Sequence, residues 1–164
     1  VLDHIERIAY ATSSFRTSSV ALERFCAHFN YEPMLFEAKD SSGSLVYHTN
    51  VMMCLGSDYV LICDDMITNL QRRLEVLSRL KASGREVISL SEEQINGFCG
   101  NALELHGNHG RFLAMSDTSR KLLTQQQLEK IQNKLPVEFF DVATLELAGG
   151  SIRCMLAGIH LSQR

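Results

Sequence analysis

Hydrophobic and polar positions alternate along this chain in an order that recurs. Residues 51–63 are two apolar segments around Gly56-Ser57-Asp58, which is typical of a β-hairpin. A helical pattern follows over 68–82, and a strand is predicted over 86–90. Four leucines lie on or near one face of this predicted helix: Leu70, Leu74, Leu77 and Leu80. The pattern therefore predicts a hairpin, a helix and a closing strand.

The same order returns further along the chain. Residues 102–115 predict a second hairpin with its turn at 107–110, and a strand is expected over 137–142. The helix between them begins at Thr124, which can form a capping box with Gln127. A repeated unit with one apolar face needs neighbours to bury that face.

An earlier copy is recognisable in the strands predicted over 5–14 and 32–38 and the helix around 19–29. The chain thus reads as about three ββαβ units of an α/β fold, in one domain covering residues 1–164. The units are placed roughly at 1–45, 46–95 and 96–148, with 149–164 opening the next.

Composition narrows the function classes. The chain carries 16 basic and 19 acidic residues, for a formal net charge of −3, without a block of like charges. Nucleic acid is therefore not an expected partner. The longest strictly apolar run, at residues 59–63, is far too short for a membrane span, so no membrane association is expected.

The cysteines indicate a reducing compartment. Their number is odd and no two form a CxxC pair, which favours a cytoplasmic protein over one with a disulfide framework or a zinc site. The histidines are scattered, and we expect neither a metal nor a cofactor. Four cysteines are assigned to packing or structure: Cys26, Cys54, Cys63 and Cys99.

The segments entering the hairpins are the candidate chemical sites, because repeated units can bring such junctions to one axis. The junctions lie at 47–53, 99–105 and 149–155; the first contains His48 and the last Cys154. A histidine beside a cysteine can act as base and acid and lowers the thiol pKa. Taken alone, a cysteine in an apolar run is more often a core residue.

Two asparagines occupy comparable junction positions. Asn50 and Asn101 could face the axis, or they could tie down turn backbone.

The motifs Y-H-T-N-V-M-M (47–53) and GGSIRCMLA (149–157) resemble the second half of the guanidino-group-modifying superfamily. That superfamily contains amidinotransferases, arginine deiminases and dimethylarginine hydrolases, and the resemblance points most to bacterial amidinotransferase-like proteins. It covers nearly the whole chain. It implies a five-bladed α/β propeller with the active site on its axis, of which this chain supplies about three blades as a C-terminal portion.

The resemblance also implies roles for individual residues. Cys154 matches the family nucleophile and His48 the general acid/base. Arg16, in S-F-R-T (14–17), matches the arginine that holds the substrate carboxylate; it could instead be a solvated charge. Gly149 and Gly150 either let the backbone approach the substrate or simply make the turn.

The sequence departs from the family pattern at its start. The acidic residues that hold the guanidinium group in the family have no motif match here and would precede Val1. We therefore expect residues 1–164 alone to show little or no turnover, and we expect possible self-association or pairing with the missing N-terminal part.

Three function classes follow. We favour a cysteine-dependent enzyme that acts on a guanidino or ureido C–N bond of an arginine- or citrulline-like small molecule through a covalent intermediate, with hydrolysis weakly preferred to amidino transfer. A catalytically incompetent fragment or non-catalytic scaffold is the alternative of another class. A papain-like hydrolase ranks last, because its nucleophile begins a helix whereas Cys154 follows glycines in a strand-like run.

Overall fold

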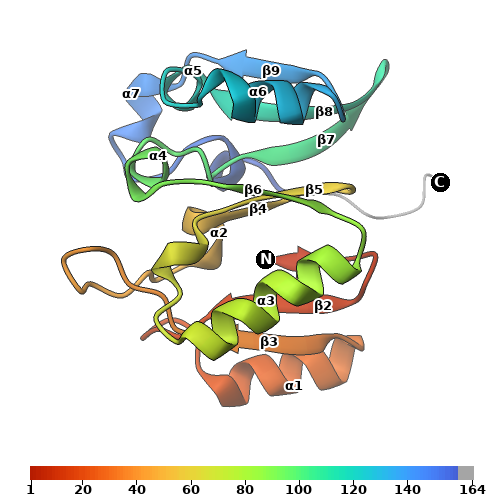
Figure 1. The fold of residues 1–164 in the computed structure, drawn as a ribbon, viewed down its shortest axis with the longest axis vertical. Helices are drawn as coiled ribbons and strands as arrows, with labels where there is room; N and C mark the ends of the chain where they lie inside the picture. Colours follow the sequence, from red (N-terminus) through yellow and green to blue (C-terminus); the bar gives the residue numbers. More distant parts are fainter. Residues whose placement is uncertain (159–164) are drawn as a thin grey trace.

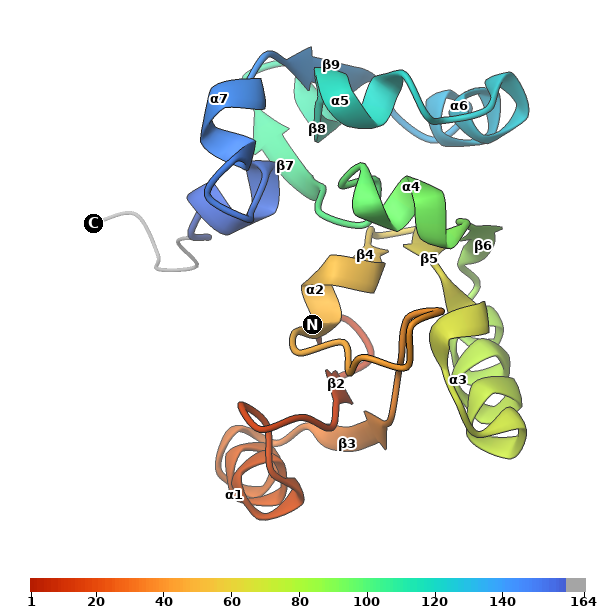
Figure 2. The same ribbon diagram turned by 90° about the vertical axis from the view of Figure 1, so that its left-hand side faces the viewer.

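Three small mixed sheets succeed one another along the chain and are stacked in that order (Figures 1 and 2). The structure, a computed structural model, describes residues 1–158. Each sheet pairs an antiparallel hairpin with a third, parallel strand. The strands are β1 (Leu2–Asp3), β2 (Ile8–Thr12) and β3 (Glu32–Phe36); β4 (Met53–Leu55), β5 (Tyr59–Ile62) and β6 (Glu86–Ser89); and β7 (Leu103–Gly107), β8 (Gly110–Ser116) and β9 (Val137–Phe140).

A helix connects the parallel strands of each sheet, as a parallel crossover requires. These helices are α1 (Ser19–Phe29), α3 (Leu70–Ala82) and α6 (Gln125–Gln132). The predicted capping box of Thr124 and Gln127 is present at the start of α6. The α/β fold with repeated ββαβ units is therefore confirmed. The shorter helices are α2 (Thr49–Met52), η1 (Asp64–Met66), α4 (Glu92–Asn96), α5 (Asp117–Arg120), α7 (Ala143–Glu146) and η2 (Ile152–Met155).

The middle sheet forms the centre of the core because the other two sheets flank it. All four residues of β5 are completely buried, which explains why this strand is continuously apolar rather than alternating. Within residues 1–158 no helix is long and apolar enough to cross a membrane.

The four leucines predicted on or near one face of α3 are not all buried. Leu70 and Leu74 are more than half exposed, whereas Val76 and Leu80 are completely buried. Val76 and Leu80 are one helical turn apart and define the stripe that faces the core. Leu70 is the first residue of the helix, and the two residues before it are exposed as well.

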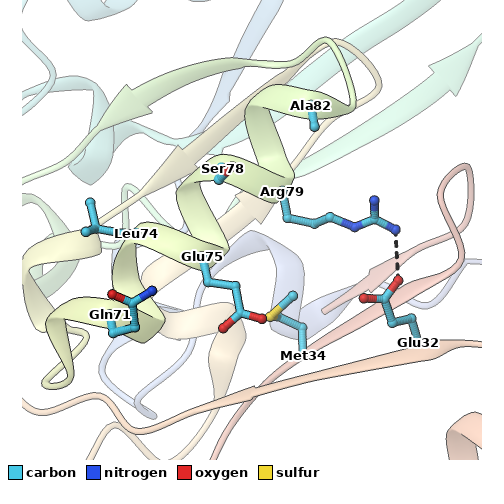
Figure 3. A pocket seen from close by; sticks show the side chains of 8 residues that line it. All are labelled: Glu32, Met34, Gln71, Leu74, Glu75, Ser78, Arg79 and Ala82. Carbon is cyan, nitrogen blue, oxygen red and sulfur yellow. Dashed lines mark hydrogen bonds and ion pairs between the residues drawn. The ribbon is translucent and has the colours of Figure 1, made fainter.

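Leu74 lines a hollow of about 570 Å³ between α3 and β3 (Figure 3). An ion pair between Arg79 of α3 and Glu32 of β3 spans this hollow with an N–O distance of 2.8 Å. None of the predicted site residues lines this hollow. The hollow is therefore a feature of the outer surface between two units.

A buried ion pair joins the first sheet to the second. Arg85, just before β6, donates through Nη2 to Asp3 Oδ1 at 2.9 Å and lies 2.7 Å from Oδ2 through Nη1. Arg85 Nε also donates to the carbonyl of Gly56 at 2.9 Å. Both side chains are almost fully inaccessible, so each charge depends on the other for compensation.

Arg85→Met should destabilise the protein by about 3–5 kcal/mol, because it leaves the Asp3 carboxylate buried without its cation. The matched control is Arg79→Met, which removes the half-exposed Arg79–Glu32 pair and should cost no more than about 1 kcal/mol. Urea unfolding of both variants measures the difference. Equal losses would contradict the structural importance of the Asp3–Arg85 pair.

Candidate active site

Cys154 differs from the other four cysteines in being exposed to solvent. The other four are buried, as expected for packing residues, and all five are free thiols. Burial raises the pKa of Cys54 and Cys99 to about 12 and that of Cys63 to about 11. Because the thiolate is the nucleophilic form, the buried cysteines are unsuited to chemistry near neutral pH and Cys154 is the remaining candidate.

The expectation that Cys154 lies in a strand-like run is wrong. It belongs to η2, a short 3-10 helix whose turn is closed by a hydrogen bond from the Cys154 backbone N–H to the Ser151 carbonyl at 2.9 Å. Apolar residues in so short a segment do not distinguish a strand from a helical turn. Residues 159–164, the rest of the predicted opening unit, lie outside the described residues.

The two glycines before Cys154 have different local roles. Gly149 adopts a φ of +94°, a conformation that side chains rarely allow, and therefore makes the turn. A Cβ atom at Gly150 would lie 2.9 Å from Cys154 Cβ and 3.1 Å from its Sγ. Glycine at position 150 thus leaves the space in which the Cys154 side chain sits.

Two asparagine amides contact the thiol of Cys154. Asn101 Nδ2 lies 3.1 Å from Cys154 Sγ, and Asn50 Nδ2 lies 3.4 Å from the same atom. Asn101 Oδ1 accepts a hydrogen bond from the Ser151 N–H at 3.1 Å. Asn101 therefore contacts the thiol and also ties down turn backbone, which is the second of the two roles considered from the sequence.

These contacts bring the three hairpin junctions together. Asn50 belongs to the first, Asn101 to the second and Cys154 to the third. The sulfur is thus the point at which segments from three parts of the sequence meet.

A carboxylate that the sequence analysis missed binds the residues beside this arrangement. Glu146, at the end of α7, accepts hydrogen bonds at 2.6 Å from Ser151 Oγ and from Thr118 Oγ1. Burial by itself raises the pKa of Glu146, but hydrogen bonds from Ser151, Thr118 and Ser116 outweigh burial and lower it. The only signal in the sequence is the proximity of Glu146 to the glycine turn, which does not identify a partner.

His48 immediately precedes the short helix that carries Asn50. It is the N-cap residue of α2, its side chain makes no capping hydrogen bond, and its ring centroid is 4.9 Å from that of Tyr47. Among residues 1–158 no hydrogen bond joins His48 to Cys154. The structure therefore brings α2 to the thiol through Asn50 and leaves the His48–Cys154 pairing as a prediction.

Arg16 lies near the segment that carries His48. Its guanidinium carbon is 5.7 Å from the centroid of the Tyr47 ring, and Ser14 Oγ donates to the Tyr47 carbonyl at 3.0 Å. Arg16 is exposed, and no carboxylate of residues 1–158 forms an ion pair with it.

A family model shows that the chain is a member of the guanidino-modifying superfamily, as the sequence motifs indicated. A model of the family described as N,N dimethylarginine dimethylhydrolase, eukaryotic, matches residues 1–161. The chain belongs to this family.

Solved structures agree on the fold. The N-terminal domain of ArgZ, an arginine dihydrolase of cyanobacteria solved with its product, matches with a TM-score of 0.73 and 18% identity over 94% of this chain and 52% of that one. Unliganded AgrE matches with a TM-score of 0.72 and 18% identity over 94% of this chain and 21% of that one.

SxtG, an amidinotransferase from Microseira wollei in the saxitoxin biosynthetic pathway, gives a TM-score of 0.63 at 12% identity over 91% of this chain and 43% of that one. The chain thus spans about half or less of the length of these relatives. No curated protein matches the chain.

Glu146→Gln should lower the free energy of unfolding by about 2 kcal/mol at pH 7, because hydrogen bonds to a charged acceptor are replaced by neutral ones. The Glu146 pKa is lower in the folded protein. The carboxylate contribution is therefore complete above the unfolded value of about 4.3 and is lost as pH falls through the folded pKa.

Urea unfolding of the wild type and Glu146→Gln between pH 7 and pH 3 should show a difference that shrinks below about pH 4. The exposed Glu138, changed to Gln, is the control and should have little effect at any pH. A Glu146→Gln difference that stays constant with pH would contradict an ionised anchor.

Proposed function

We propose that Cys154 is the nucleophile of a hydrolase that cleaves a guanidino C–N bond in an arginine-like amino acid. The observation that carries this proposal is the exposed thiol at the meeting point of three junctions, with two amide donors on its sulfur. Membership in the dimethylarginine dimethylhydrolase family supports the substrate class and favours hydrolysis over amidino transfer.

The proposed reaction has two covalent steps. The Cys154 thiolate attacks the guanidinium carbon, a C–S bond forms, and the C–N bond to the departing amine breaks as His48 supplies a proton to that amine. Water, deprotonated by His48, then attacks the thiouronium carbon, the C–S bond breaks, and the thiolate returns. The products are a ureido amino acid and an amine or ammonia.

The remaining predicted site residues have binding roles in this proposal. Arg16 is positively charged and unpaired within the described residues, which suits it to the substrate α-carboxylate. Gly150 keeps side-chain bulk away from the sulfur, so a planar guanidinium group can approach it, and Gly149 makes the turn that precedes it.

The first test measures alkylation of Cys154 by mass spectrometry as a function of pH. In His48→Ala the rate at pH 7 should fall by about tenfold or more, because the charged imidazole no longer favours the thiolate. His28→Ala, at an exposed position of α1, is the matched control and should react like the wild type. An unchanged rate in His48→Ala would remove His48 from the mechanism.

Product analysis with arginine or dimethylarginine distinguishes hydrolysis from transfer. Any turnover should release a ureido amino acid whether or not an acceptor amine is added, and Cys154→Ser should abolish it. A new guanidino compound that forms only with the amine would instead identify a transferase.

A further inference from the structure

We propose that Asn101 is a positioning residue that holds the Cys154 side chain and stabilises its thiolate, with Asn50 as a second donor. This inference rests on the proposed role of Cys154 as nucleophile. Asn101 is only 4% exposed, although it lies beside an exposed cysteine. A buried amide whose polar atoms are all engaged can fix the position of its neighbours.

The orientation of the Asn101 amide follows from its partners. Oδ1 faces the Ser151 N–H at 3.1 Å, and a backbone N–H can only donate, so an oxygen is required there. Nδ2 lies 3.4 Å from the carbonyl of Asn50, which can only accept. Both contacts require the same orientation of the Asn101 amide. In that orientation an N–H group of the amide points at Cys154 Sγ.

Two N–H donors on one sulfur favour its charged form. A thiolate is a stronger hydrogen-bond acceptor than a thiol, so donors at 3.1 Å from Asn101 and 3.4 Å from Asn50 stabilise the anion more than the neutral group. An amide does not titrate in this pH range, so the effect does not depend on its own protonation. It therefore acts alongside the proposed His48 base and does not replace it.

Asn101 also binds the backbone of the helical turn η2, which contains Cys154. The Asn101 carbonyl accepts from the Arg153 N–H at 3.3 Å, while its side chain accepts from the Ser151 N–H. Asn101 thus contacts the residues on both sides of Ile152 and the sulfur of Cys154. Displacement of η2 and loss of the donor are separate consequences of changing this residue, and they can be measured separately.

The decisive variant is Asn101→Asp, which keeps the shape and the acceptor for Ser151 but replaces the donor to sulfur by a carboxylate oxygen. The rate of Cys154 alkylation by iodoacetamide, a neutral reagent, is measured from pH 5 to pH 10. The midpoint of this profile should rise by at least about one pH unit, with an approximately tenfold lower rate at pH 7. Asn50→Asp should shift it in the same direction by less.

Asn69→Asp is the matched control, because Asn69 is the N-cap of α3 and aspartate caps a helix equally well. It should leave the midpoint unchanged. Thermal unfolding identifies variants that fail to fold. If Asn101→Asp is folded and its midpoint equals that of the wild type, the proposal is overturned. If it does not fold, Asn50→Asp decides: a raised midpoint supports the donor role, and an unchanged one overturns it.

These outcomes are distinguishable from failure of the proposed function. A raised midpoint in Asn101→Asp together with no effect of His48→Ala supports the positioning role and contradicts the His48 assignment. The reverse pair of results supports His48 and overturns the role of Asn101.

Discussion

The hydrogen bonds of the Asn101 amide are the interaction on which the arrangement around Cys154 depends. One buried side chain contacts the sulfur, the backbone of Ser151 and the carbonyl of Asn50. It thereby connects the segment before β7 to α2 and to η2. Without this connection the segment before β7 would lose its polar contact with the sulfur, and the turn that carries Cys154 would lose the acceptor for the Ser151 N–H.

The sheets provide the rigid frame for this connection. β5 is buried along its whole length between the other two sheets, and the Asp3–Arg85 pair fixes the first sheet against the second. Glu146 holds the glycine turn through its hydrogen bond from the Ser151 hydroxyl. A reactive group on a short helical turn can be placed reproducibly only when the elements beside it do not move.

Much of the fold could be predicted from local sequence. The hairpin turns and the capping box of Thr124 and Gln127 depend on residues close in the chain, and both are found where the pattern placed them. The burial of the α3 leucines could not be predicted from their spacing, because Leu74 belongs to the leucine pattern but lines a hollow beside β3. The helical turn at Cys154 and the anchoring role of Glu146 depend on partners that the local pattern does not reveal.

The central claim is that the folded structure activates Cys154 as a nucleophile. The most direct test compares the alkylation rate of Cys154 at pH 7 in the native chain and in the chain unfolded in urea, with each cysteine quantified by mass spectrometry. The account predicts that Cys154 reacts faster when native, while the four buried cysteines react faster when unfolded. A Cys154 that reacts no faster in the native chain than in the unfolded one would be merely exposed, and the claim would be contradicted.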